Sequence, residues 1–275
     1  MNDIIDAINS NVQTVENTYI GQDGLLHCTK CGGARQTRIT VPMVGERVVG
    51  IICECMKEEQ AALARREEEE EKERKRKVCF AETNMHSWNF RNSDGKNPQL
   101  EEAMKRYVQN FTQLKKEGKG LLLYGTVGNG KTYMAACIAN ALIDEGYKVL
   151  MTNFASLTNE IQGMWDGKQQ YINSLNHYSL LIIDDLGAER KSEFMQEMVF
   201  NIIDSRYRSG LPMIITTNLS IDELKKPKDI GNSRIYDRIL ERCHPIEVKG
   251  ISKRREKIKE SYHRINALLG IKKGD

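Results

Sequence analysis

The chain has 275 residues and a formal net charge of +3, with 29% charged and 40% hydrophobic residues. This length allows one large domain or two, and the composition is that of an ordinary globular protein. No apolar run approaches the roughly 18 residues of a membrane span, and the first residues lack the basic and apolar regions of a secretory signal. We therefore expect a cytoplasmic protein without a membrane partner, whose seven cysteines are reduced or bound to metal.

Residues 1–20 carry apolar side chains at the spacing of one face of an amphipathic helix, namely Ile4, Ile5, Ile8, Val12 and Val15. This face is expected either to pack on the following module or to dock a partner protein. Farther along, 16 of the 22 residues from Met56 to Lys77 are charged, and Glu repeatedly precedes Lys or Arg by four positions. That pattern favours a solvated helix that links two domains; the alternative for its basic end, residues 74–77, is a nucleic-acid patch.

Two close pairs of cysteines, C-x-x-C followed by two glycines and then C-x-C, mark the N-terminal part; they are Cys28, Cys31, Cys53 and Cys55. Residues 37–41 and 47–52 between the pairs have the composition of a β-hairpin. Four thiolates would complete the tetrahedral coordination of a structural Zn²⁺, although His27 could replace one of them. The alternative is four reduced cysteines in a small β module, but so short a segment needs a staple.

Residues 121–143 begin with an apolar run, continue into a glycine-rich turn and end in a segment of good helix formers. The turn fits the G-x-x-x-x-G-K-[ST] pattern of a P-loop, whose backbone N–H groups surround nucleotide phosphates at a helix N-terminus. Lys131 would neutralise phosphate charge, and Thr132 would hold Mg²⁺. The expected nucleotide-binding residues are Gly125, Thr126, Val127, Gly128, Asn129, Gly130, Lys131, Thr132 and Tyr133.

Two carboxylates, Asp184 and Asp185, follow the buried-strand pattern of residues 180–183. Because strand and helix patterns alternate along this part of the chain, we expect a parallel sheet flanked by helices. Asp184 would bind Mg²⁺ through water, and Asp185 would orient or deprotonate the attacking water. A further strand pattern, residues 211–217, ends at Asn218, which would face the ligand crevice and hold the attacking water or the γ-phosphate; its alternative is a turn or capping residue.

Three arginines, Arg234, Arg238 and Arg242, are spaced four residues apart and share one face of a predicted helix. Such a stripe usually serves solubility, but an arginine at a subunit edge can also reach the γ-phosphate bound by a neighbouring subunit. The segment after residue 238 is basic, which is a mild nucleic-acid signal.

Together these motifs resemble the AAA+ ATPases of the DnaC/DnaI helicase-loader and IstB transposition-helper group. The resemblance covers roughly residues 80–269 and is carried by residues 180–189, 214–218 and 233–243. It implies the α/β AAA+ fold of a P-loop NTPase, with Arg238 or Arg242 as an arginine finger acting in trans and Arg254 as the sensor 2 residue. Asp185 stands where many AAA+ proteins have Glu, which is consistent with slow hydrolysis.

The cysteine module and its charged linker resemble the N-terminal half of DnaI-type loaders, which contacts the replicative helicase. The resemblance thus implies a docking module at 1–57, a helical linker at 58–78 and an AAA+ domain with a short helical lid at 79–275. It further implies an ATP-dependent loader of the hexameric replicative helicase that uses ATP, Mg²⁺ and Zn²⁺, self-associates, and contacts single-stranded DNA through residues 154–177. The alternatives are an IstB-type transposition helper and a nucleotide-gated adaptor with little turnover.

Overall fold

The computed structural model describes residues 17–81, 83–188, 192–227 and 229–250, and several positions within 258–269. The chain divides into two compact units, with the boundary between Glu71 and Lys72. The apolar face predicted near the N-terminus and the predicted sensor 2 residue, Arg254, lie outside the described residues. In the part of the chain that is described, no helix is both long and apolar enough to cross a membrane.

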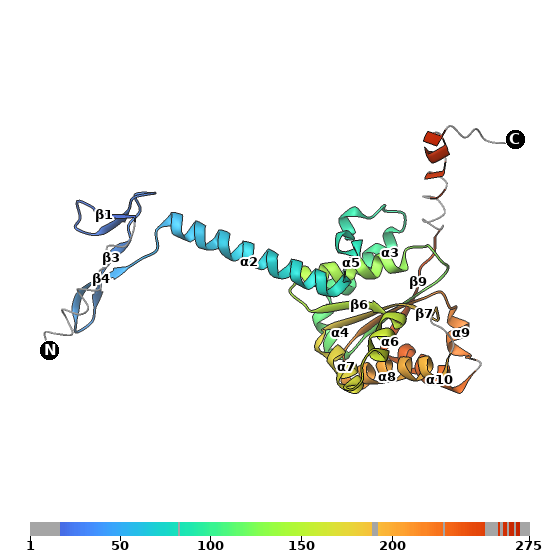
Figure 1. The fold of residues 1–275 in the computed structure, drawn as a ribbon. Coiled ribbons are helices and arrows are strands. Elements are labelled where there is room, and N and C mark those ends of the chain that lie inside the picture. Colours follow the sequence, from blue (N-terminus) through green and yellow to red (C-terminus); the bar gives the residue numbers. More distant parts are fainter. Residues whose placement is uncertain are drawn as a thin grey trace. The chain divides into compact units, whose positions relative to one another are not determined.

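The N-terminal unit contains two small antiparallel sheets (Figure 1). In the first, β1 (Thr18–Ile20) pairs with β2 (Leu26–Cys28). In the second, β3 (Gln36–Val41) pairs with β4 (Gly45–Gly50), so the predicted hairpin is observed. Two-stranded sheets of this size are marginal in water by themselves, and the unit therefore needs another source of stability.

A single helix, α2 (Glu54–Phe80), begins at the second cysteine pair and contains the charged segment that was predicted to be helical. Its surface carries ion pairs one turn apart, such as Arg66 with Glu70. The boundary between the two units falls inside this helix. At its end, Cys79 and Phe80 are buried in the core of the C-terminal unit, so the helix changes there from a solvated to a packed element.

The C-terminal unit is built on a five-stranded sheet in the order β6-β7-β8-β5-β9, with every neighbouring pair parallel. Its strands are β5 (Gly120–Tyr124), β6 (Val149–Asn153), β7 (Leu180–Leu186), β8 (Met213–Thr217) and β9 (Cys243–Glu247). This arrangement confirms the predicted α/β fold with a parallel sheet. It also places β8 between β5 and β7, although β8 comes last of these three strands in the sequence.

Helices cover both faces of this sheet (Figure 1). One layer contains α3 (Pro98–Gln109), α4 (Phe111–Glu117) and α5 (Lys131–Asp144), preceded by the short turns η1 (Asn84–Ser87) and η2 (Phe90–Asn92). The other contains α6 (Phe154–Gln162), α7 (Lys168–Ser174), η3 (Leu175–His177), α8 (Glu193–Ser209), α9 (Ile221–Lys225) and α10 (Ile230–Arg242).

Alternation along the strands explains why the sheet is covered twice. In β5, Leu121 and Leu123 pack into one core, whereas Leu122 between them packs into the other. Successive strand side chains point to opposite faces, so an uninterrupted apolar strand must be buried on both sides.

Arg206 of α8 is a buried cation, with 1% of its surface exposed. Its guanidinium donates to four carbonyl oxygens, those of Leu175, Tyr178, Ser179 and Pro212. Burial lowers the pKa of Arg206 to about 10, so the group stays charged at neutral pH. The side chain therefore ties the entry of β7 and the entry of β8 to α8.

Candidate functional site

The P-loop lies where β5 ends and α5 begins, as predicted. Gly125, Gly128 and Gly130 have φ angles of 137°, 87° and 99°, in the region that favours glycine. At Gly125 a Cβ atom would also come within 2.7 Å of the Val248 carbonyl oxygen, so no larger residue fits. The side chain of Asn129 is buried and donates to that same carbonyl, which fixes the loop against the chain segment that follows β9.

Lys131 is 5% exposed and is the first residue of α5, directly after the loop. Its Nζ donates to the carbonyls of Gly125 (2.8 Å) and Thr126 (2.9 Å), and to Asn218 Oδ1 (2.8 Å). Asn218 follows β8, so this contact joins two neighbouring strands at their carboxyl ends. The structure therefore brings together the predicted lysine and the predicted polar residue of the ligand crevice.

Thr132 and Asp184 are also adjacent. The Thr132 hydroxyl donates to both carboxylate oxygens of Asp184, at 3.0 and 3.1 Å. Burial raises the pKa of Asp184, and the hydroxyls of Thr216 and Thr132 act in the opposite direction. A hydroxyl and a carboxylate at hydrogen-bond distance are hard oxygen donors of the kind that Mg²⁺ prefers, so these residues fit the expected ion.

Asp185 has a left-handed backbone conformation, with φ of 56°. The pairing of β7 with β8 shifts register between Ile183 and Leu186, so Asp185 lies in an irregular stretch of the strand. Its backbone N–H donates to the Thr216 hydroxyl at 2.9 Å. A non-glycine residue in this conformation is uncommon and often marks a functional position.

Two other members of the predicted loop set, Val127 and Tyr133, have different surroundings. Val127 is exposed at the loop. Tyr133 turns toward the segment before α3, where its hydroxyl donates to the Asn89 carbonyl at 2.9 Å and its ring lies 5.5 Å from that of Trp88. The segment around Trp88 is therefore anchored to the first turn of α5.

The arginine stripe lies on α10 as predicted, but its members differ in their surroundings. Arg234 is exposed. Arg238 donates to Asp204 at 2.9 Å and lies over the rings of Phe200 and Tyr207. In this conformation Arg238 is thus engaged by α8 of its own chain.

Arg242 lies 4.8 Å from the ring centre of the same Tyr207, and that tyrosine's hydroxyl donates to Glu241. Asp204 in turn also pairs with Arg208, at 2.8 Å. Sequence reasoning did not find Asp204 or Tyr207, because their partners are more than thirty residues away and no local pattern links them.

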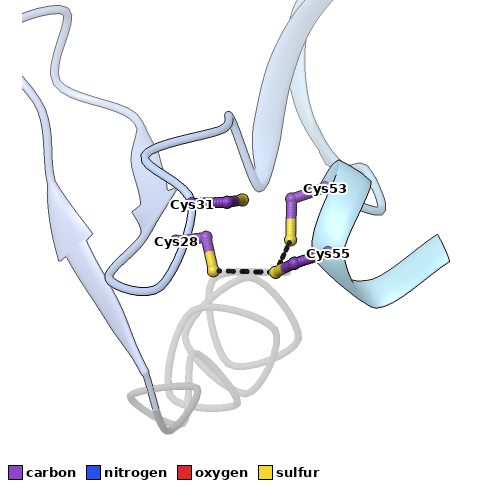
Figure 2. A group of neighbouring side chains, drawn as sticks. All are labelled: Cys28, Cys31, Cys53 and Cys55. Carbon is purple, nitrogen blue, oxygen red and sulfur yellow. Dashed lines mark hydrogen bonds between the residues drawn. The ribbon is translucent and has the colours of Figure 1, made fainter. Parts of the chain in front are cut away.

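The four predicted cysteines gather at one point of the N-terminal unit (Figure 2). All four sulfurs lie within 4.8 Å of one another, with Cys28–Cys55 at 3.5 Å and Cys53–Cys55 at 3.4 Å. Zn–S bonds of about 2.3 Å require sulfur–sulfur distances of roughly 3.8 Å in a tetrahedron, so the cluster has the dimensions of a zinc site. One pair comes from the β2 turn and the other from the start of α2.

Local hydrogen bonds shift the pKa values of the cysteine thiols. Backbone N–H groups of Cys31 and Lys30 point to the Cys28 sulfur and lower its pKa to about 6, whereas hydrogen bonds from neighbouring thiols raise the pKa of Cys55. The turn needs glycine at Gly32, whose φ is 69°. Lowering a thiol pKa favours the thiolate, which is the form that binds metal.

His27 does not join this cluster. Its Nε2 lies 3.0 Å from the Asp23 carboxylate, and its Nδ1 lies 3.2 Å from the Gly32 carbonyl. The carboxylate raises the pKa of His27. Within the described residues, the candidate metal ligands are therefore the four cysteines.

Comparison with known proteins relates this chain to a family of ATP-binding proteins. A model of the IstB-like ATP binding protein family matches residues 48–261. The chain is 29% identical to the replicative helicase loader DnaI of Bacillus subtilis over 55% of this chain and 54% of that protein. It is 30% identical to a putative insertion sequence ATP-binding protein of Sinorhizobium fredii over 53% and 50%.

A crystal structure of DnaI superimposes with a TM-score of 0.54 and 26% identity, over 66% of this chain and 99% of that one. The chain spans about half the length of the curated relatives it matches. Since the family model covers most of the sequence, the chain belongs to the IstB-like ATP-binding proteins, AAA+ ATPases among which it resembles the helicase loaders of the DnaC/DnaI type.

Proposed function

We propose that this protein is an ATP-dependent loader of a hexameric replicative DNA helicase. The observation that carries the proposal is the convergence of Lys131, Thr132, Asp184 and Asn218 at the carboxyl edge of adjacent strands. Ligands bind at this edge in open parallel sheets. The similarity to a replicative helicase loader supports the choice of partner.

In the proposed reaction, the P-loop amides and Lys131 hold the β- and γ-phosphates. When bound, Mg²⁺ supplies charge neutralisation at the phosphates, and Thr132 and Asp184 would hold it. Lys131 would exchange its contacts with the Gly125 and Thr126 carbonyls for phosphate oxygens. Asp185 would orient the attacking water, and Asn218 would contact the water or the γ-phosphate.

We assign the N-terminal unit to docking on the helicase. The four cysteines would hold one structural Zn²⁺, which leaves no position open for catalysis. We further propose that residues 1–57 form the docking module, that 58–78 form its helical linker, and that 79–275 form the ATPase domain with its lid.

Arg238 or Arg242 is proposed to complete the site of a neighbouring subunit, with Arg254 acting as sensor 2 within the chain. To act in trans, Arg238 must leave Asp204.

A complementation assay tests this proposal. Subunits with Lys131→Ala lack a working nucleotide site, and subunits with Arg238→Ala lack the arginine finger. If Arg238 acts in trans, mixing the two inactive variants restores part of the ATPase activity; if the mixture stays inactive at every ratio, Arg238 is not the trans residue.

For single-stranded DNA we propose residues 154–177 as the contact. Trp165 lies between α6 and α7, and its side chain is fully exposed. Bases stack on exposed aromatic rings with little sequence preference, at roughly 1–3 kcal/mol per base. Trp165→Ala should therefore weaken single-stranded DNA binding about tenfold or more, measured by fluorescence anisotropy. Unchanged binding would remove this segment from the proposal.

Co-purification with the replicative helicase, with and without ATP, tests the central proposal. We expect the full chain to retain the helicase, and we expect Cys53→Ser to lose it. A matched control is Cys137→Ser, since Cys137 is buried in the ATPase unit and lies outside the cluster. Failure of the unaltered chain to bind helicase under either condition would contradict the loader function.

The family match and the insertion-sequence relative favour one alternative, a transposition helper of the IstB type. Capture of a transposase instead of the helicase would select it. A nucleotide-gated adaptor is the second alternative. Asp185→Asn distinguishes it, because an adaptor would keep loading when turnover is lost, whereas a hydrolysis-driven loader would not.

A further inference from the structure

Thr216 of β8 contacts both acids near the carboxyl end of β7, Asp184 and Asp185. The residue is fully buried, and its hydroxyl makes two hydrogen bonds. It donates to Asp184 Oδ1 at 2.5 Å and accepts the Asp185 backbone N–H at 2.9 Å. A single hydroxyl therefore contacts both residues of the acidic pair.

The two bonds depend on one another. Because the Asp185 N–H occupies a lone pair of the hydroxyl oxygen, the hydroxyl proton is directed to the carboxylate of Asp184. The same carboxylate also accepts from Thr132. Asp184 is thus held from two sides, by α5 and by β8.

The strand order explains why β8 supplies this contact. β8 lies between the P-loop strand β5 and the acidic strand β7. Thr216 and Asn218 are two residues apart and so share one face, and Asn218 contacts Lys131 at 2.8 Å. Residues 216–218 therefore contact the acidic pair of β7 through Thr216 and contact Lys131 through Asn218.

We propose that Thr216 is a positioning residue for the metal-binding carboxylate. Its hydroxyl holds Asp184 in the orientation that receives Mg²⁺, and it holds Asp185 in its left-handed conformation. This inference rests on the proposed ATP-dependent function. Thr132 would turn from Asp184 toward the ion when Mg²⁺ binds, and Thr216 then remains as the donor that keeps the carboxylate in place.

The neighbouring Thr217 offers a matched comparison. It is equally buried, and its hydroxyl also makes two bonds, donating to the Leu186 carbonyl at 2.7 Å and accepting the Leu219 N–H at 3.1 Å. These bonds join strand ends and touch neither acid. Thr216→Val and Thr217→Val each remove one buried hydroxyl at nearly constant volume. Of the two variants, only Thr216→Val removes a hydrogen bond to Asp184.

The test measures binding of the non-hydrolysable analogue AMP-PNP to the full chain by calorimetry, in Mg²⁺ and in EDTA. The ratio of the two affinities is the gain due to the metal. We expect T216V to reduce this gain about tenfold or more, since hydrogen bonds to charged groups contribute strongly, and to change the affinity in EDTA little. T216S should restore the gain, and T217V should keep it.

Unfolding of each variant without nucleotide provides the structural control, and T216A replaces T216V if the latter does not fold. The proposal is overturned if T216V keeps the full metal-dependent gain, or if T217V loses it equally. Absence of any metal-dependent gain in the unaltered chain would instead overturn the proposed function, so the two failures are distinguishable.

Discussion

The two units of this chain differ in what holds them together. In the C-terminal unit, helices bury both faces of a parallel sheet, and two apolar cores result. In the described part of the N-terminal unit, residues 17–71, the only buried residues are Cys28 and Cys53. Both of these belong to the four-cysteine cluster.

This difference indicates two sources of stability. Apolar burial stabilises the C-terminal unit whether or not ligand is bound. The described residues 17–71 of the N-terminal unit contain no apolar core. A small module of this kind depends on bound metal, whose binding free energy then contributes to the free energy of folding. Four changes to the protein test this difference between the units.

Removal of metal should have the largest effect. Structural zinc sites contribute about 10–16 kcal/mol of apparent binding free energy, so chelation should abolish protection of residues 17–71 in hydrogen exchange. The ATPase unit should keep its protection and its melting temperature. Metal analysis of the full chain should find about one zinc, and none in Cys31→Ser. A metal-free chain with a protected N-terminal unit would contradict the contrast.

Arg206→Met should lower the stability of the C-terminal unit only. It removes the Arg206 donor from four carbonyls, two of them in buried and two in partly buried hydrogen bonds, which should lower the free energy of unfolding by about 3 kcal/mol. Arg208→Met is the matched control, since that side chain is 77% exposed in its pair with Asp204. It should cost at most about 0.5 kcal/mol. Chemical denaturation, followed with zinc content, would reveal whether the effect stays in one unit.

Lys131→Ala should remove a contact to phosphate and leave the sheet intact. We expect a loss of about 2 kcal/mol in ATP binding, or roughly thirtyfold in affinity. The exposed Lys168 supplies a control, because Lys168→Ala lies on α7 away from the loop. Calorimetric titration with ATP and Mg²⁺ measures both variants, and an unchanged affinity in Lys131→Ala would refute the P-loop assignment.

His27→Ala should have the smallest effect. The imidazole contacts Asp23 and Gly32 and no cysteine sulfur, so zinc affinity should change less than about threefold. Competition with a chromophoric chelator provides the measurement. A loss of tenfold or more would place His27 in the ligand set.

Much of the fold could be predicted because its signals are local. Apolar runs that end in glycine or aspartate indicated the strands, and residue spacing alone identified the P-loop and the four cysteines. The position of β8 between β5 and β7 could not be predicted from the periodicity of the sequence, because strand pairing joins segments far apart in the chain.

The same reason explains which site contacts were missed. Thr216 could have been found, since strand alternation places it on the face of Asn218, two residues later. The pairing of Arg238 with Asp204 could not, because it depends on how α8 and α10 pack. Similarly, the exclusion of His27 from the cluster depends on Asp23 being close enough to bind its ring.

Val248 gives the P-loop a mechanical connection. Its N–H donates to the Tyr124 carbonyl at the end of β5, and its own carbonyl accepts from Asn129 within the loop. The residue thus bridges the strand that enters the loop and the loop itself, directly before the chain continues toward the C-terminal segment. Because both hydrogen bonds meet at Val248, a displacement of Asn129 on nucleotide binding would be transmitted to the end of β5.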